Sequence, residues 1–399
     1  MSLRLHKLTL SLFRNHEATR LDFAHHGVAD DVVVLSGVNG AGKTNILEAI
    51  SMLTPGKGLR GSDAADITRR MPVDGGDAGE GWAVAGEVQK PDGFTARLGA
   101  GYDPRTQKRR LRIDGKDVRA TSAFAGHFAA LWLTPQMDGL FTDSASSRRR
   151  FLDRMVMAYG SDHAARLNRY EKLQRERMNL LQARRMDDRW LAALEQQMAG
   201  EAVAIAAARM VVGEHLQHHS RMFSDLEKLF PAPLIAIVGE TEEALLGQPA
   251  VAVEENYAAR LKALRAEDMQ RNRTTMGVHR SDLRVTYAAK NMPAELASTG
   301  EQKALLLSLV LAHAQMMRAE KGFVPALLLD EVAAHLDDAR RMQLFACLRA
   351  LGGQVFVTGT DAAVFAPCVP DARYVHVTAG PGNVARVAVQ NNPAQGVSV

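Results

Sequence analysis

The chain has 399 residues and a formal net charge of +4, and 46% of its residues are hydrophobic while 24% are charged. This length allows two domains with a sizeable core, and the composition is that of an ordinary globular protein. No apolar run approaches the roughly 18–20 residues that span a bilayer, and the two cysteines suggest a reduced protein without a disulfide framework. We therefore expect a cytoplasmic protein with no membrane partner.

The N-terminal region predicts strands that lead into a phosphate-binding loop. Alternating or apolar stretches predict strands near 2–12, 18–24 and 32–35, and a helix follows the loop to about Leu53. The loop, which matches G-x-x-x-x-G-K-[ST], consists of Gly37, Val38, Asn39, Gly40, Ala41, Gly42, Lys43 and Thr44. Its glycines let backbone N–H groups approach phosphates at the positive end of the helix. Lys43 is expected to neutralise the β- and γ-phosphates of a nucleotide, and Thr44 to hold Mg²⁺.

Glycine-rich and then helical segments follow. The stretch 54–140 contains short predicted strands at 82–88, 95–102 and 109–113, and Asp114-Gly115 is a hairpin signal. From Ser144 to Leu229 apolar residues recur at helical spacing, which predicts two or three amphipathic helices. Prolines end this run, and 257–268 predicts one more helix.

Strands and helices alternate again after residue 277. The predicted strands are 283–288, 325–330, 354–358, 373–377 and 384–389, and the predicted helices are 302–321 and 340–351. Nucleotide-binding signals occur near both ends of the chain, so the two ends must meet in one α/β domain. We expect an ATPase head built from 1–140 and 273–390, a mainly helical inserted lobe at 141–272, and a flexible tail at 391–399.

A second signal is the apolar strand that ends in Asp330 and Glu331. Such a strand places the carboxylate at the carboxyl edge of the sheet, beside the phosphate-binding loop. We expect Asp330 to contact Mg²⁺ and Glu331 to polarise the attacking water as the catalytic base. A buried strand that merely ends at an acidic turn is the competing interpretation. The loop at 37–44 favours the functional one.

A third signal opens the helix predicted over 302–321. It consists of Ser298, Thr299, Gly300, Glu301 and Gln302. Ser298 and Glu301 have the spacing of a capping box, so a plain helix start would also explain the pattern. The functional interpretation uses the same geometry, with the Ser298 hydroxyl directed at a phosphate. Asp337, soon after Glu331, suits a loop that crosses to a second copy of the site.

Together these motifs resemble the ATP-binding cassette (ABC) superfamily. Thr299 and Glu301 depart from the common Ser-Gly-Gly-Gln signature, and this combination is similar to the RecF family, whose ATPase heads are related to those of SMC proteins. Further stretches that resemble this family are Leu12-Phe-Arg14-Asn15, Leu53–Gly61, Ser147-Arg-Arg-Arg-Phe-Leu-Asp153 and Gly277-Val-His279-Arg280-Ser-Asp282. In the last of these, Val278 and Ser281 depart from the family's Gly-Pro-His-Arg-Asp-Asp.

The resemblance implies an ABC-type head in which ATP and Mg²⁺ lie between two copies of the chain. Each copy would lend Ser298 to the γ-phosphate bound by the other, Arg14 would lie near the nucleotide, and Gln136 would stand in the position of the cassette Q-loop. It also implies a weak ATPase that binds double-stranded DNA and single-strand/double-strand junctions. RecR would be a partner, with RecO and RecA downstream, in DNA repair, recombination and replication.

Two other classes fit less well. A transporter ATPase subunit usually has a His after the strand that follows Asp330, but here that strand ends in Thr358-Gly359. A long-armed SMC protein needs longer helices than the residues between Thr44 and Ser298 allow at about 1.5 Å per residue. Four basic clusters could attract phosphate backbones, although each alone also fits a solvated face; they are Lys108–Arg110 with Arg112, Arg148–Arg150, Arg184–Arg185, and Arg271 with Arg273.

Overall fold

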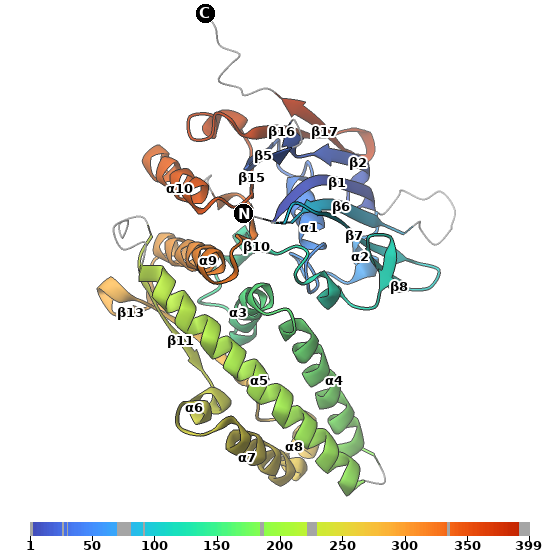
Figure 1. The fold of residues 1–399 in the computed structure, drawn as a ribbon, viewed down its shortest axis with the longest axis vertical. Helices are drawn as coiled ribbons and strands as arrows, with labels where there is room; N and C mark the ends of the chain where they lie inside the picture. The colour runs from blue at the N-terminus through green and yellow to red at the C-terminus, as the bar shows by residue number, and fades with distance from the viewer. Residues whose placement is uncertain are drawn as a thin grey trace, which may run out of the picture. The chain divides into compact units, whose positions relative to one another are not determined.

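The computed structural model describes residues 3–25, 28–29, 31–69, 81–90, 92–183, 187–221, 230–332 and 336–390. The chain forms two compact units, which we call the head (residues up to Met137 and from Ala314 onward) and the lobe (Asp138–His313). The first division lies beside the predicted one at 140. The second comes at 313 rather than 272, because β12 (Asp282–Tyr287) pairs with β11 (Pro233–Val238) inside the lobe. Figure 1 shows the elements of both units, and helix α9 (Thr299–Lys321) runs across the division. The tail predicted at 391–399 lies outside the described residues.

The head contains a six-stranded sheet in the order β10-β14-β15-β5-β16-β17. The first five strands run parallel, and β17 closes one edge antiparallel to β16. The strands are β5 (Val32–Ser36), β10 (Ala130–Leu133), β14 (Ala326–Leu329), β15 (Val355–Gly359), β16 (Arg373–Ala379) and β17 (Ala385–Gln390). Every residue of β5, β10, β14 and β15 is buried, which explains their uninterrupted apolar sequences.

A second six-stranded sheet of the head is antiparallel, in the order β2-β1-β6-β7-β8-β9. Its strands are β1 (Arg4–Phe13), β2 (His16–Asp22), β6 (Ala83–Gln89), β7 (Thr95–Asp103), β8 (Lys108–Ile113) and β9 (Lys116–Val118), and β3 (Ala24–His25) and β4 (Val28–Ala29) form a small hairpin beside it. The predicted hairpin at Asp114-Gly115 is confirmed, since both residues have positive φ between β8 and β9.

Helix α1 (Lys43–Ser51) packs against β1 of one sheet and β15 of the other. The buried Gln354 side chain joins the same two sheets, because it accepts from the Leu5 N–H at 2.8 Å and donates to the Leu5 carbonyl at 3.0 Å. The remaining head helices are α2 (Ala64–Ile67) and α10 (Asp338–Leu351). The head therefore holds the start of α1 between two sheets, at the point where β5 ends.

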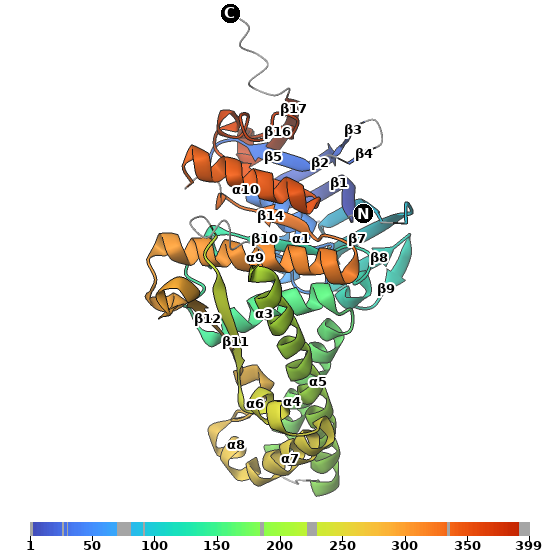
Figure 2. The same cartoon turned by 60° about the vertical axis from the view of Figure 1, so that its left-hand side comes forward.

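The lobe is mainly helical, as predicted. Its helices are α3 (Ala145–Tyr159), α4 (His163–Leu181), α5 (Asp188–Ser220), α6 (Glu240–Gly247), α7 (Ala250–Ala263) and α8 (Arg265–Arg271). The helices expected over 144–229 are thus three, and the one expected at 257–268 is broken at Leu264. Figure 2 shows β11 running beside α5, and with β12 and β13 (Met292–Pro293) it makes a small antiparallel sheet. The strand predicted at 283–288 is confirmed as β12, whereas β11 and β13 were not predicted.

Buried ion pairs cross the helices of the lobe. Arg177 on α4 donates to Glu195 on α5 at 3.0 Å and to Asp268 on α8 at 2.7 Å, and all three side chains are buried. Arg209 on α5 binds both carboxylate oxygens of Asp153 on α3. Because a buried charge without its partner is strongly destabilising, these pairs fix how the helices meet. None of the helices in the described ranges offers the long apolar stretch that crossing a bilayer requires.

Candidate nucleotide site

The parallel sheet of the head brings three sequence segments to one edge. β5 leads into the 37–44 loop, β14 ends at Asp330, and β15 between them ends with Thr358 and Gly359. Parallel neighbours end at the same edge, which is where open α/β sheets bind ligands. The sheet order therefore places the two ends of the chain around a single position.

The 37–44 loop has the backbone shape that the glycines were predicted to give it. Gly37 has φ 145°, and a Cβ there would lie 2.0 Å from the Val377 carbonyl oxygen. Gly42 has φ 114°, and a Cβ there would lie 2.6 Å from Oδ1 of Asn15. Gly42 caps α1 without a side-chain hydrogen bond, and the first turn of the helix contains no acidic residue. The amino end of α1 is therefore suited to an anion.

Lys43 begins α1 and is buried. Its ammonium Nζ donates to the carbonyl oxygens of Gly37 at 2.6 Å and Val38 at 3.0 Å. Burial lowers the pKa of Lys43, and the nearby carboxylates of Glu331 and Asp330 oppose this shift. The positive charge is thus held over the loop, where phosphate oxygens would be attracted to it.

Asp330, at the end of β14, connects the 37–44 loop with the neighbouring strand β15. Its carboxylate accepts from the Thr44 hydroxyl at 2.9 and 3.0 Å and from the Thr358 hydroxyl at 2.8 Å. Burial raises the pKa of Asp330, and these hydroxyl hydrogen bonds act against that rise. The hydroxyl oxygen of Thr44 and the carboxylate of Asp330 are oxygen donors of the kind that Mg²⁺ prefers, so the residues present fit this ion.

Glu331 follows with a left-handed backbone, φ 56°. Its N–H donates to the Thr358 hydroxyl at 2.9 Å, so the same threonine that binds Asp330 also fixes the backbone of Glu331. A non-glycine residue in this region costs free energy, and such residues often occur at functional sites. Thr358 was not predicted as a site residue.

Arg14 is engaged within the head. Its guanidinium binds both carboxylate oxygens of Glu48 on α1, at 2.9 and 2.7 Å, and also reaches Ser62. Arg60 donates to the same carboxylate at 2.6 Å, and Glu48 is only 1% exposed. Arg14 and Arg60 thus clamp Glu48 between them. The predicted approach of Arg14 to ATP stays a prediction.

Asn15 and His16 hold the loop from the β1–β2 turn. Asn15 donates to the Ala41 carbonyl at 3.0 Å and accepts from Asn45 at 2.7 Å. His16 is buried against the Gly42 carbonyl at 3.2 Å, and burial lowers its pKa. The resemblance at 12–15 was the signal for this turn; it included Asn15 but assigned a site role to Arg14 alone, and it stopped before His16.

The segment 298–302 belongs to the lobe and forms a full capping box. Ser298 N–H and Oγ donate to Glu301 at 2.9 and 2.8 Å, and the Glu301 N–H donates to Ser298 Oγ at 3.4 Å. Lys290 and these bonds lower the pKa of Glu301 to about 2. The Gln302 side chain turns back to the Ala297 carbonyl at 2.8 Å, while Ser298, Thr299 and Gly300 are exposed. The helix-start interpretation is thus correct, and a role at phosphate stays a prediction.

Two further predicted residues are exposed. Gln136 lies in a short 3-10 turn, Pro135–Met137, directly after β10, the strand next to β14. Asp337 caps α10 by accepting from the Arg340 N–H at 2.8 Å. Both positions follow strands of the parallel sheet, and their roles stay predictions.

The sequence matches known proteins along nearly its whole length. Residues 4–380 match the family described as "RecF/RecN/SMC N terminal domain". The "DNA replication and repair protein RecF" of Mesorhizobium japonicum is 45% identical over 382 residues, which cover 94% of this chain and 97% of the relative. The chain belongs to the RecF family. A RecF of Agrobacterium fabrum is 43% identical over 389 residues, with 94% and 97% covered.

Solved structures agree with a RecF-type head. A structure described as "the recombination mediator protein RecF-ATP in RecFOR pathway" superimposes with a TM-score of 0.81 at 23% identity, covering 98% of both chains. An Smc head from Pyrococcus furiosus gives a TM-score of 0.53 at 16% identity, covering 98% of this chain and 96% of the other. At such identities these likenesses show the fold, and they confirm the predicted ATPase-head architecture.

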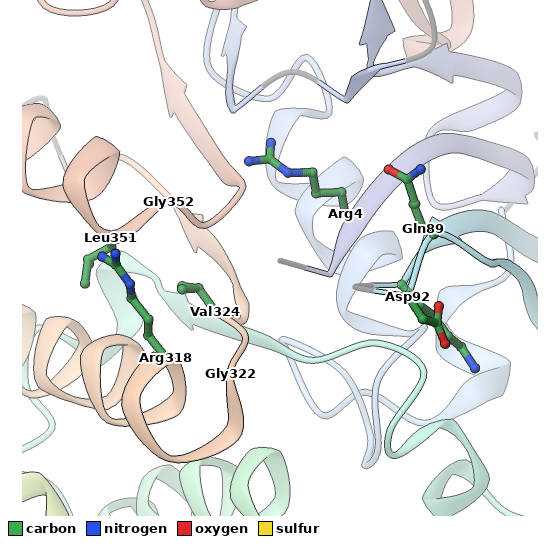
Figure 3. Close-up of a pocket in the computed structure, with 10 residues that line it drawn as sticks. Arg4, Gln89, Asp92, Arg318, Gly322, Val324, Leu351 and Gly352 are labelled. Atoms are coloured by element: carbon green, nitrogen blue, oxygen red, sulfur yellow. The ribbon is translucent and has the colours of Figure 1, made fainter. Parts of the chain in front are cut away.

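The head of this RecF-family chain also contains a cavity of about 550 Å³ away from the 37–44 loop. Figure 3 shows Arg318, Val324 and Leu351 on one side of it and Arg4 and Gln89 on the other. Val324 and Leu351 precede β14 and β15, so this cavity lies at the amino edge of the parallel sheet. Ligands of open α/β sheets bind at the opposite edge, which keeps the 37–44 loop as the nucleotide site.

Proposed function

We propose that this chain is an ATP-dependent, DNA-binding recombination mediator that acts in DNA repair and replication. The observation that carries the proposal is the direct connection of Thr44, Asp330 and Thr358 at the end of the phosphate-binding loop. This arrangement offers one triphosphate a positive loop, a pair of oxygen ligands for Mg²⁺ and an adjacent carboxylate. The RecF-family relatives, which are named as replication and repair proteins, support the biological role.

Each residue of the site has a proposed task. The N–H groups of 37–44 and the Lys43 ammonium bind the phosphates, and Thr44 with Asp330 would hold Mg²⁺, which neutralises phosphate charge when bound. Glu331 orients and polarises the attacking water, and Gln136 would sense that water or the ion. The chain is then a weak ATPase, in which hydrolysis serves as a switch.

ATP also acts as the contact between two copies of the chain. Ser298 and the amino end of α9 would bind the γ-phosphate held by the other copy, because a helix start with an exposed hydroxyl suits an anion. Asp337 would cross to the same shared site. The ATP-bound dimer binds double-stranded DNA and single-strand/double-strand junctions through backbone phosphates, and it acts with RecR, and through RecR with RecO, to help load RecA.

The nucleotide role is tested with Lys43→Met. The variant loses the charge that faces the phosphates, so we expect loss of ATP binding measured by titration calorimetry, together with loss of ATP-dependent DNA binding. Lys116→Met, which removes an exposed lysine from β9, is the matched control and should bind ATP normally. Unchanged nucleotide affinity in Lys43→Met would refute the assigned site.

The dimer is tested separately with Ser298→Arg. This variant should bind ATP as one subunit but fail to form dimers, measured by light scattering with a slowly hydrolysed ATP analogue. Thr106→Arg introduces the same charge in an exposed turn of the head and should dimerise normally. A normal dimer of Ser298→Arg would mean that this segment is only a helix cap.

A further inference from the structure

The lobe contains a cavity of about 550 Å³ that four arginines line, namely Arg149, Arg175, Arg273 and Arg280. We propose that this cavity binds a backbone phosphate of DNA and anchors the lobe to the nucleic acid without reading its sequence. The inference rests on the proposed DNA-binding function and assigns that function a place. It also gives a task to Ser147–Asp153 and Gly277–Asp282, two stretches that the nucleotide site does not use.

In each basic cluster that the structure describes, one or two arginines pair with a carboxylate. On β8, Arg110 pairs with Asp103 at 2.8 Å and Arg112 with Asp117 at 2.8 Å. The same holds in the lobe, where Arg148 binds Asp282 and Arg271 binds Glu267. Arg184 and Arg185 lie outside the described residues. Each of these ion pairs has no net charge, so it attracts a polyanion less than an unpaired arginine does.

The arginines of the cavity keep their charge. Arg273 and Arg280 are exposed, and no carboxylate within the described ranges forms an ion pair with either. Arg149 is partly buried and donates to the Ser281 carbonyl at 2.6 Å, and Arg175 reaches only Glu171, at 3.9 Å. None of the described residues that line the cavity is acidic. The cavity therefore presents a concentrated positive charge.

The wall of the cavity is rigid. A turn at Val278–Arg280 carries His279 and Arg280, and buried Arg209 fixes it by donating to the Val278 carbonyl at 2.7 Å. The His279 Nε2 lies 3.1 Å from the Thr274 carbonyl, which makes this nitrogen the donor, and Nδ1 then accepts from Tyr170 at 3.1 Å. The backbone of the turn that carries Arg280 is therefore already held in place before an anion binds.

The glycine that begins this turn is required by the packing. Gly277 has φ 129°, and a Cβ there would lie 2.3 Å from the Tyr257 hydroxyl and 2.4 Å from the Tyr170 hydroxyl. Those two hydroxyls are 2.8 Å apart and bond to each other in the core of the lobe. The Gly277–Asp282 stretch thus forms a scaffold that aims Arg280 into the cavity.

Phosphate is the ligand that this chemistry favours. Guanidinium groups match phosphate oxygens with paired N–H donors, and Ala145 in the lining starts α3, whose amino end adds partial positive charge. Among the described residues, the lining has no Phe, Tyr or Trp ring on which a base could stack, and its one imidazole, His279, is only partly exposed. A phosphodiester is therefore favoured over a nucleobase, and binding should tolerate any sequence.

The test removes the two exposed charges with Arg273→Gln/Arg280→Gln in the full-length chain. Fluorescence anisotropy with a labelled gapped duplex, an ATP analogue present, measures affinity over a range of NaCl concentrations. Loss of this one phosphate contact should flatten the log–log salt slope by about 0.9 and weaken binding roughly 5-fold at about 0.15 M salt. Arg260→Gln, which neutralises an exposed arginine elsewhere in the lobe, should change neither.

The outcomes separate this inference from the proposed function. If the unaltered chain does not bind DNA, the proposed function fails. If it binds DNA and the double variant has the same affinity and slope, the assignment of the cavity is overturned. If the double variant instead loses ATP-analogue binding while DNA binding stays intact, the cavity belongs to a free nucleotide phosphate, which also overturns the inference.

Discussion

Glu48 is the charge on which the position of α1 depends, and Glu48→Gln tests this. The substitution keeps the shape of the side chain but removes the negative charge that Arg14 and Arg60 share at 2.6–2.9 Å. Two guanidinium groups would then converge on a neutral, buried amide. We expect lower stability of the head and weaker ATP binding, because Glu48 lies on the helix that begins with Lys43.

The size of the expected loss of stability follows from the burial of Glu48 and its two arginine partners. Glu48 is 1% exposed, whereas Arg14 is 20% and Arg60 28% exposed, so water can replace the lost partner only in part. Breaking a buried ion pair from one side costs about 3–5 kcal/mol. For a unit of this size, 1 kcal/mol shifts the midpoint of thermal unfolding by about 2–4 °C, which gives a fall of roughly 6–20 °C.

Differential scanning calorimetry measures this shift, and a surface pair provides the control. Glu17 is 58% exposed and pairs with Arg69 at 2.9 Å, also in the head. Glu17→Gln should cost less than about 1 kcal/mol, as exposed pairs do. If Glu48→Gln shifts the midpoint no more than Glu17→Gln does, the clamp has no structural importance and the reasoning is wrong.

Three other variants address the site and the lobe. Thr358→Val removes the hydroxyl that binds Asp330, so steady-state ATP turnover should fall at least tenfold while nucleotide affinity by calorimetry changes little. Gly277→Ala places a Cβ 2.4 Å from the Tyr170 hydroxyl at positive φ, and urea unfolding should show a loss of about 2–4 kcal/mol. His313 is buried, and burial lowers its pKa from 6.5 to about 4. The unfolded chain therefore takes up a proton first, so the stability that this histidine contributes is present above pH 6.5 and is lost as the pH falls towards 4, by about 3 kcal/mol in total. His313→Leu should flatten that part of the curve of unfolding free energy against pH.

Each of these variants has a control or an opposing outcome. Thr378→Val, on an exposed position of β16, should leave turnover unchanged. Gly200→Ala, inside α5 with nothing near the added Cβ, should stabilise the lobe by up to about 1 kcal/mol, opposite in sign to Gly277→Ala. An equally steep acid transition in His313→Leu would assign the acid sensitivity to other groups.

Much of the head could be predicted because its signals are local. Residues 37–44 and Asp330 stand at the ends of apolar strands, and parallel strands end at one edge, so their meeting followed from pattern alone. Thr358 could not be found in this way, because a threonine at a strand end is unremarkable until β15 is known to lie between β14 and β5. Sheet order depends on contacts between segments that are distant in sequence, so no local pattern predicts it.

The remaining differences have similar causes. The lobe extends to His313 because β11 and β12 pair across more than forty intervening residues, and the apolar stretch at 233–238, which begins with a proline, was not predicted as a strand. The strand β10 was not predicted, because it is only four residues long and lies in a glycine-rich region. The ion pair of Arg14 with Glu48 joins side chains far apart in sequence, so the sequence placed Arg14 near the nucleotide and could not foresee its partner.

The left-handed backbone of Glu331 means that the head gives up some stability at this position. Glycine would adopt the same conformation without steric conflict and would release on the order of 1 kcal/mol, but it would bring no carboxylate to the end of β14. A variant selected only for heat resistance should therefore tend to replace this glutamate and lose turnover as it does so. At this position, therefore, greater stability and ATP turnover require different residues.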